Sequence, residues 1–593
     1  MRSTVVTAAP EDVREVRGPL SGKRRIPGII LTCLLTVATI VLFLVSRGKW
    51  SDAIIDSGRE WIVPDALARG EVLYRDVVYW FGPFTPYFHA GFFKALGSSF
   101  QTLVVAGIVG SLGVLAALYS ALRTVTGRLE AALWTTLAVP ALVFMPDSGG
   151  SILGMGYRMW HAAAFALLAV AILDYRDTAP RPWRLLASGA LAGLAGLCRT
   201  EWGILTLLAA GLVYLLQRTA RRTVWRGALT ILAGFLLVFA GVITLFGAIG
   251  GWDSLLRESP VLLMNVPEQT RSHVAFAGIQ AWRAGIWSLL YSAALWVGLF
   301  LVTEIVTLRP VDPGRARRRL PWLVVLLGLF ALSVWGAAGF PEAPIWSAAP
   351  LICLAASLVA VRGRLSQRQA TLAGFGVLGF LLSHRRPFFI GDGPYVGPPL
   401  LFALACAAGL VQIVVNREAS EGIRESLRAG ILSVVVLLIG LAFAARLAEY
   451  RRDERVWIAG TGKSLSARAE LALEIKALVA AIRASSRQED GLVALPEGEI
   501  VNFLSGRANP LRHKLYLPGY VNDSNENTIL RELRRAKPTA VVIWNRPTGE
   551  YGPGLLGEGY AFAIRQWIED NYDPKPYSTA RPRAALWIIR QTR

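Results

Sequence analysis

Apolar runs long enough to cross a bilayer recur over most of this chain, from Ile26 to Arg446. A transmembrane helix needs about 20 such residues, and about 13 runs are expected to form one. They lie at 26–46, 100–122, 130–146, 159–174, 185–198, 201–217, 227–249, 286–308, 320–338, 345–361, 370–384, 398–416 and 429–446. Of the 593 residues, 54% are hydrophobic, which is rare for a soluble globular protein of this length. The sequence therefore predicts an α-helical polytopic membrane protein.

The positive charges predict how these helices are oriented. The net charge is +21, and arginines concentrate in every second short loop, for example in the RARRR run at 315–319. The positive-inside rule places these loops and the polar tail 1–25 in the cytoplasm. Successive spans place the loops on alternate sides of the membrane. The C-terminus is then outside, provided that 159–217 forms three separate short helices. The cytoplasmic placement of 309–319 favours three separate helices. Because no basic stripe with interleaved aromatic residues stands outside the loops, nucleic-acid binding is not expected.

After Arg446 the composition changes to that of a soluble domain. Short buried strands are expected at 492–495, 540–544 and 585–589, and helices at 464–485, 528–535 and 560–571. Strands that alternate with helices indicate a small α/β domain. The expected organisation is a cytoplasmic tail 1–25, a membrane module 26–446 and an extracytoplasmic α/β domain 447–593.

The first outer loop, 47–99, is far longer than a simple connection needs. It holds six carboxylates, at Asp52, Asp56, Glu60, Asp65, Glu71 and Asp76. Asp52 and Asp56 are four residues apart, so on a helix they share one face, beside a charged surface that includes Arg59 and Glu60. The aromatic run 84–96 is expected to form a second amphipathic helix in the membrane interface.

Between these two helices lies a polar turn, 71–76, that ends in Tyr74-Arg75-Asp76. Asp76 has two interpretations. It forms a local ion pair with Arg75 that fixes the turn, or it contacts a substrate.

The order of features in this loop resembles the GT-C glycosyltransferases. An acidic residue follows the first span, then a W-x-x-P motif, a Gly-Pro step and an aromatic helix that ends in Leu-Gly, before a long span. The matching pieces are Asp56, Trp61-Ile62-Val63-Pro64, Gly82-Pro83 and Leu96-Gly97. More narrowly, the loop is similar to the bacterial protein-mannosyltransferase-like group that includes the aminoarabinose transferases. Stretches 502–520 and 571–577 also resemble the outer domain of bacterial members of this group.

The resemblance implies an inverting hexosyl- or pentosyltransferase in a bacterial plasma membrane. A sugar would pass from a polyprenyl-phosphate carrier in the bilayer to a lipid, glycan or protein acceptor on the outer face. By position Asp56 matches the family's catalytic aspartate, the general base, and Asp52 is the alternative. The chain departs from the aminoarabinose transferases at Trp80-Phe81-Gly82-Pro83, where those proteins place a lysine before two prolines.

The cation that holds the lipid phosphate must therefore come from elsewhere, and arginine suits this role because its planar donors bind two oxygens. The pair Arg385-Arg386 follows a span and is the best outer-facing candidate, although such residues also reach toward headgroups for solvation alone. Arg199 is expected to pair with Glu201 at a hairpin tip. The full set of candidate substrate-binding residues is Arg59, Glu60, Tyr74, Arg75, Asp76, Arg158, Arg199, Glu201, His384, Arg385 and Arg386.

No cofactor motif stands out. Residues 552–557 match G-x-G-x-x-G but do not join a strand directly to a helix, so a nucleotide cofactor is not expected. No ligand cluster at metal spacing is apparent, and a divalent metal is left open.

The chief alternative function is a transporter or a flippase of lipid-linked saccharides, without transfer chemistry. A transporter typically has charged residues within its spans and two related halves. Few charges lie deep in the predicted spans, Glu304 being one, and no related halves are evident. A polysaccharide polymerase or ligase and a structural membrane subunit are further alternatives.

Overall fold

The structure is a computed structural model. It describes residues 25–55, 57–145, 153, 157–174, 181–217, 221–262, 352–358, 366–383, 397–417, 420–549, 554–577 and 582–590.

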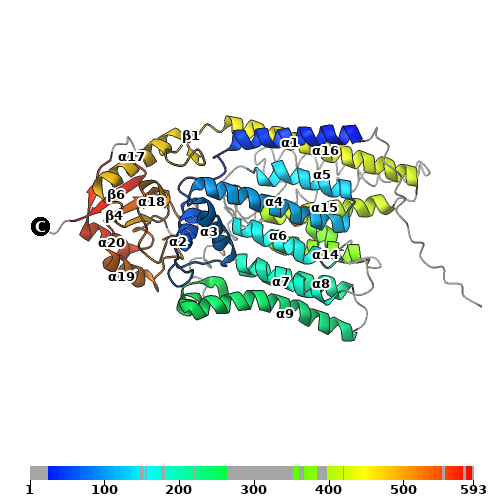
Figure 1. Cartoon of the computed structure of the whole chain (residues 1–593), viewed down its shortest axis with the longest axis horizontal. Helices are drawn as coiled ribbons and strands as arrows, with labels where there is room; N and C mark the ends of the chain where they lie inside the picture. Colours follow the sequence, from blue (N-terminus) through cyan, green and yellow to red (C-terminus); the bar gives the residue numbers. More distant parts are fainter. Residues whose placement is uncertain are drawn as a thin grey trace, which may run out of the picture.

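A bundle of long helices forms the larger part of the molecule (Figure 1). Its main helices are α1 (Arg25–Ser46), α4 (Phe100–Val125), α5 (Arg128–Ala138), α6 (Tyr157–Ala171), α7 (Pro182–Cys198), α8 (Thr200–Leu216), α9 (Arg221–Phe246), α14 (Gln367–Ser383), α15 (Gly397–Arg417) and α16 (Glu421–Arg452). Among the described residues, four helical stretches are long and apolar enough to cross a membrane by length and composition: Phe100–Val125, Trp225–Arg257, Gly397–Asn416 and Glu421–Arg452.

Apart from 345–361, each predicted run that falls on described residues overlaps one of these helices. Segment 159–217 forms three separate helices, α6, α7 and α8, as predicted. Runs 286–308 and 320–338 lie outside the described residues, and 345–361 is described only over 352–358, which is helical. The count of about 13 spans therefore stays a prediction.

The bundle has an apolar interior and an apolar exterior. Large side chains such as Trp160, Phe375 and Phe402 are buried between its helices. On its outer surface Leu237 of α9 is 70% exposed and Leu437 of α16 is 61% exposed. Apolar exposure on this scale needs another apolar phase to cover it, and the hydrocarbon of a bilayer supplies one.

Two shorter helices, α2 (Ser57–Ala68) and α3 (Phe84–Leu96), lie between the bundle and the C-terminal domain (Figure 1). Helix α3 has the predicted bounds and ends at Gly97, whose φ of 85° favours glycine. The prediction of a helical face shared by Asp52 and Asp56 is wrong for Asp52, because α2 begins only at Ser57. Asp52 lies in the preceding turn, where its Oδ1 accepts hydrogen bonds from the backbone of Ile54 (2.7 Å) and Ile55 (2.8 Å).

The C-terminal domain contains a four-stranded sheet in the order β3-β4-β6-β5. Strands β3 (Leu492–Leu495) and β4 (Ala540–Trp544) pair in parallel, whereas β6 (Ala584–Ile589) is antiparallel to β4 and to β5 (Tyr572–Lys575). Helices α19 (Glu526–Ala536) and α20 (Phe562–Asn571) confirm the predicted segments. The predicted strands are confirmed too, but edge strand β5 was not predicted, because it carries Pro574 and charged residues.

The helix predicted at 464–485 is shorter in the structure. Helix α17 spans Ala469–Ser485, because the preceding strand β2 (Ser466–Ala467) pairs with β1 (Val456–Trp457). Helix α18 (Ile500–Ser505) was not predicted either. It follows β3 and packs against α2, which joins the domain to the first loop.

Candidate active site

A charged cluster lies at the start of α2, and we define it as Arg59, Glu60, Arg158, Arg199 and Glu201. Nη1 of Arg158, on α6, donates to Oε1 of Glu60 at 2.9 Å, and the two side chains are only 4% and 7% exposed. Nε of Arg59 lies 3.7 Å from the same oxygen. Arg59 and Glu60 thus belong to one charged group, as predicted, but the group is buried and does not form a surface.

Phe81 is the residue on which the cluster converges. The guanidinium carbon of Arg158 lies 3.9 Å from the centre of its ring, and that of Arg199 lies 5.6 Å from it. Guanidinium groups are attracted to aromatic faces, most strongly where water is excluded. Phe81 was not predicted as a site residue, although it lies in the segment where the chain departs from the aminoarabinose-transferase pattern.

Gly82 permits this convergence. A Cβ atom at Gly82 would lie 2.0 Å from the carbonyl oxygen of Leu197, near the end of α7. Only glycine fits so close an approach of backbone to backbone. The contact brings the first loop against the junction of α7 and α8, where Arg199 lies. This gives a physical reason for the Gly82-Pro83 step.

Arg199 forms the predicted ion pair at the hairpin tip. Its Nη2 lies 2.5 Å from Oε1 of Glu201, and its Nη1 lies 3.3 Å from the sulfur of Met159. Tyr79 is buried nearby. Burial raises the pKa of Tyr79 to about 12, with a further contribution from the negative charge of Glu60, so its hydroxyl stays protonated at neutral pH.

The polar turn of the first loop is fixed by its own residues. Nη2 of Arg75 lies 2.7 Å from Oδ2 of Asp76, and the same oxygen accepts a hydrogen bond from the backbone of Val72 at 2.8 Å. The predicted local ion pair of Asp76 is thus confirmed. Tyr74 is fully buried, adopts φ 69° and donates its hydroxyl to the carbonyl of Phe81 at 2.6 Å. Tyr74 therefore fixes the backbone beside the charged cluster.

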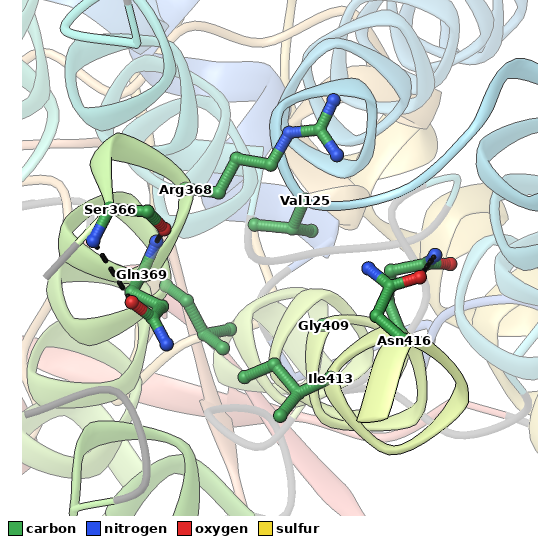
Figure 2. A pocket seen from close by; sticks show the side chains of 9 residues that line it. Val125, Ser366, Arg368, Gln369, Gly409, Ile413 and Asn416 are labelled. Atoms are coloured by element: carbon green, nitrogen blue, oxygen red, sulfur yellow. Dashed lines mark hydrogen bonds between the residues drawn. The ribbon is translucent and has the colours of Figure 1, made fainter. Parts of the chain in front are cut away.

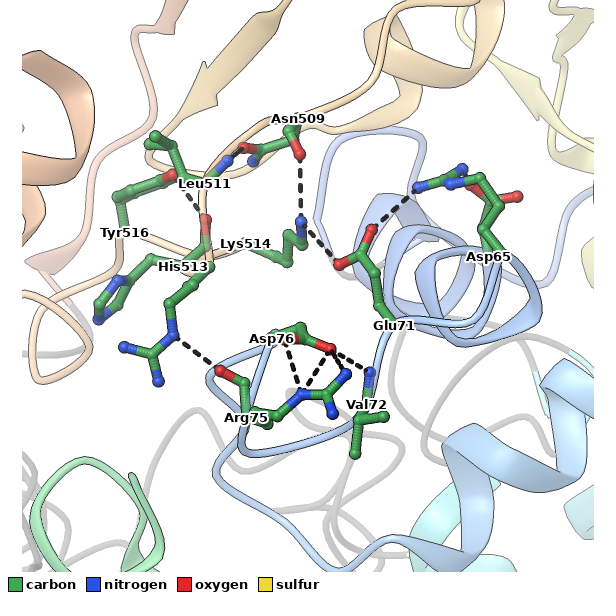
Figure 3. A network of polar contacts seen from close by, with 12 residues as sticks. Asp65, Glu71, Val72, Arg75, Asp76, Asn509, Leu511, His513, Lys514 and Tyr516 are labelled. Carbon is green, nitrogen blue, oxygen red and sulfur yellow. Dashed lines mark hydrogen bonds and ion pairs between the residues drawn. The ribbon is translucent and has the colours of Figure 1, made fainter. Parts of the chain in front are cut away.

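The C-terminal domain holds the same turn from the other side (Figure 3). Lys514 is buried, and its Nζ lies 3.5 Å from Oε2 of Glu71 and donates to the carbonyl of Asn509 at 3.1 Å. Burial lowers the pKa of Lys514, and the charge of Glu71 opposes this shift. Nε of Arg512 donates to the carbonyl of Arg75 at 3.0 Å. The domain is therefore docked on the first loop through charged contacts.

Comparison with known proteins identifies the fold. No protein-family model matches the chain, and no curated protein matches it in sequence. The crystal structure of ArnT, an aminoarabinose transferase from Cupriavidus metallidurans, in the apo state shares 13% identity with it at a TM-score of 0.52. The alignment covers 95% of this chain and 98% of that one. ArnT is a GT-C protein. This chain has the GT-C fold.

The same ArnT bound to undecaprenyl phosphate aligns with this chain at 14% identity and a TM-score of 0.50, over 96% of this chain and 98% of that one. An oligosaccharyltransferase from Archaeoglobus fulgidus tethered to an acceptor peptide gives 13% identity and a TM-score of 0.47, over 93% of this chain and 74% of that one. The likeness to apo ArnT confirms, at the level of the fold, the resemblance predicted from the first loop.

Several predicted site residues of this chain stay predictions. Asp56, His384, Arg385 and Arg386 lie outside the described residues. The residues that flank Asp56 are described, and α2 begins directly after it. The structure thus brings together Arg59, Glu60, Arg158, Arg199 and Glu201. It fixes Tyr74, Arg75 and Asp76 in the adjoining turn and places Asp52 in the turn that precedes α2.

A pocket of about 360 Å³ lies at the end of α4 away from the first loop, and Figure 2 shows its lining from close by. Its lining comes from the end of α4 at Val125, the start of α14 around Arg368, and the end of α15 near Asn416. Because Val125 and the first loop are at opposite ends of α4, this pocket is separate from the charged cluster. Across the described residues, no group of three or more His, Cys, Asp or Glu side chains is placed to hold a metal ion.

Proposed function

We propose that this GT-C chain is an inverting glycosyltransferase that moves a sugar from a polyprenyl-phosphate carrier to an acceptor on the outer face of the plasma membrane. The observation that carries the proposal is the charged cluster, in which arginines from three segments meet at the start of α2, directly after Asp56 in sequence. The likeness to ArnT in complex with undecaprenyl phosphate supports a carrier of that class.

The cluster suits the leaving phosphate. Its three arginines outnumber its two glutamates, so the cluster carries excess positive charge. Arg199 is 17% exposed at its side chain, whereas Arg158 is 4% exposed and stacked on Phe81. Guanidinium groups held in place with little water around them stabilise charge that develops on a departing phosphate. Arg385 and Arg386 are proposed as further phosphate ligands from the sequence.

Asp56 is proposed as the general base. Its carboxylate takes the proton from the acceptor hydroxyl while the acceptor oxygen forms a bond to the anomeric carbon. The bond from that carbon to the phosphate oxygen breaks, and its electron pair leaves with the polyprenyl phosphate, which the arginines hold. Attack from the face opposite the phosphate inverts the anomeric centre, so a single base suffices. Addition of a chelator to the transfer assay tests whether the reaction requires a divalent metal.

The proposed topology places this chemistry outside the cell. The first loop and the C-terminal domain lie at one end of the bundle (Figure 1), and the arginine-rich loops support a cytoplasmic location for the other end. Labelling of a cysteine introduced at Asp52 tests the assignment. Reaction with an impermeant thiol reagent added outside intact cells is expected, and protection there with reaction only after lysis would refute an extracytoplasmic site.

The decisive experiment measures sugar transfer by the purified full-length protein in lipid nanodiscs. Radiolabelled polyprenyl-phosphate hexoses and pentoses are offered with lipid, glycan and protein acceptors. Asp56→Asn is expected to abolish transfer, because it removes the base and keeps the size of the side chain. Asp52→Asn is the matched control: an asparagine Oδ1 can accept the same two backbone hydrogen bonds, so transfer should persist.

Full sugar-transfer activity in Asp56→Asn, together with loss of that activity in Asp52→Asn, would indicate that Asp52 is the general base. Movement of labelled lipid across the membrane of proteoliposomes, with no sugar transferred by any protein tested, would refute the transferase proposal and support a flippase.

A further inference from the structure

Glu499, from the C-terminal domain, reaches the first turn of α2. It lies just before α18, is 0% exposed, and accepts a hydrogen bond on Oε2 from the backbone of Gly498 at 3.1 Å. A Cβ atom at Gly58 would lie 2.7 Å from both the backbone nitrogen and Oε2 of Glu499. The carboxyl group therefore lies directly against the α2 backbone, at a place that only a glycine leaves open.

Aromatic contacts keep α18 in this position. The ring of Phe503 packs edge-on against Trp61 of α2, with 5.0 Å between the ring centres, and against Phe100 of α4 at 4.8 Å. Trp61 also donates its indole N–H to Ser98 at 3.0 Å. Residues of α2, of α4 and of the C-terminal domain thus form one packed unit around Glu499.

The carboxyl group of Glu499 has unused hydrogen-bonding capacity. Within the described part of the chain, its Oε1 is buried and has no hydrogen-bond partner. A buried polar atom in this state is rare and calls for a reason. The neighbouring Glu497 differs, because it forms an ion pair with Arg546.

We propose that Glu499 is a positioning residue for the transfer reaction: its carboxyl group, supplied by the C-terminal domain, holds the first turn of α2 and thereby the arrangement of Arg59 and Glu60. The inference rests on the proposed function, because it assigns the C-terminal domain a part in the same site. Glu499 lies against Gly58 of α2. The next two residues of α2 are Arg59 and Glu60, and Glu60 forms ion pairs with Arg59 and with Arg158.

The charge state of Glu499 determines whether this contact is favourable. Burial raises its pKa to about 8. The negative charge of Glu497 raises this pKa further, and the positive charge of Arg59 lowers it. Facing it from the other packed elements is Tyr516, which burial keeps protonated. Below about pH 8 Glu499 is neutral, and as the pH rises through that value it becomes a buried anion that competes with Glu60 for Arg59. The arrangement of α2 is therefore lost on the alkaline side.

The test follows kcat/KM for sugar transfer by the full-length protein between pH 6 and pH 10. Wild-type kcat/KM should fall with a midpoint near pH 8, by about tenfold for each further pH unit. Glu499→Gln is neutral at every pH, so it should keep activity at pH 7 and lose this alkaline decline. The matched control is Glu474→Gln in the same domain. Glu474 is also buried, but it accepts hydrogen bonds from Tyr577 and from the backbone of Arg583, and its substitution should leave the midpoint unchanged.

A second measurement needs no transfer activity and no variant. Hydrogen exchange of the α2 peptide 57–68 in the wild-type protein, corrected for the intrinsic rate, should accelerate above pH 8, whereas that of α17, 469–485, should not. An unchanged alkaline midpoint in Glu499→Gln, loss of activity in it at all pH values, or constant protection of 57–68 would overturn the positioning role. If no protein transfers sugar but hydrogen exchange of 57–68 still accelerates above pH 8, the proposed function is refuted. The contact between Glu499 and α2 is then still supported.

Discussion

Replacing Glu60 with glutamine removes a negative charge that Arg59 and Arg158 share, and the structure sets the size of the effect. Oε1 of Glu60 lies 2.9 Å from Arg158 and 3.7 Å from Arg59. At an effective dielectric constant near 20, a pair at the shorter distance interacts by about 6 kcal/mol. Desolvation offsets much of this gain, and removing one partner of a buried pair usually costs about 3–5 kcal/mol. Because glutamine still accepts a hydrogen bond, we expect a loss of about 3 kcal/mol in the free energy of unfolding.

The assay is thermal unfolding in detergent, followed by tryptophan fluorescence at one fixed scan rate, since membrane proteins of this size often unfold irreversibly. Glu60→Gln should lower the apparent Tm by several degrees. The matched control is Glu470→Gln, because Glu470 lies 3.4 Å from Arg583 but is 89% exposed, and it should leave the Tm unchanged.

A double-mutant cycle with Arg158→Met isolates the pair. The double variant should be more stable than the sum of the single losses implies, because Arg158→Met removes the guanidinium that loses its shorter contact with a carboxylate in Glu60→Gln. Strict additivity, or a Tm of Glu60→Gln equal to that of the wild type, would refute the conclusion that this buried pair is coupled.

The glycine contacts give two further predictions, both measured as apparent Tm in the same detergent. Gly82→Ala places a methyl group 2.0 Å from the carbonyl of Leu197, where backbone faces backbone, and should destabilise the protein by about 3 kcal/mol or more. Gly58→Ala places one 2.7 Å from Glu499, which should cost about 1–3 kcal/mol and loosen the C-terminal domain. Gly91→Ala, in the middle of α3 with open space around it, is the control and should stabilise the helix by up to about 1 kcal/mol. A Tm of Gly82→Ala at or above that of Gly91→Ala would contradict the close approach at Leu197.

Much of the fold could be read from local patterns. Helix α3 has its predicted bounds, and strands β3 and β4 match their predicted segments residue for residue. Apolar periodicity and turn residues are properties of short windows, so they are visible before any tertiary contact is known. Local reasoning failed where a neighbour intervened, as in α17, whose predicted first turn is extended because Ser466 and Ala467 pair with β1.

The candidate site divides in the same way. The sequence alone determined that the chain is a helical membrane protein with an α/β domain at its C-terminus, and it named Glu60, Arg158 and Arg199 among the candidate substrate-binding residues. It could not determine that Arg158 meets Glu60 98 positions away, because that contact depends on how α6 packs against the first loop.

Burial, too, was decided only by the tertiary structure. Arg59 and Glu60 stand in a stretch rich in polar residues, which favours an exposed face, yet the packing of α18 and of the bundle removes them from water. The contact of Glu499 with Gly58 joins residues from opposite ends of the chain. Local patterns fix the helices and strands; which side chains lose water, and hence which charges interact strongly, depends on packing between elements that are distant in sequence.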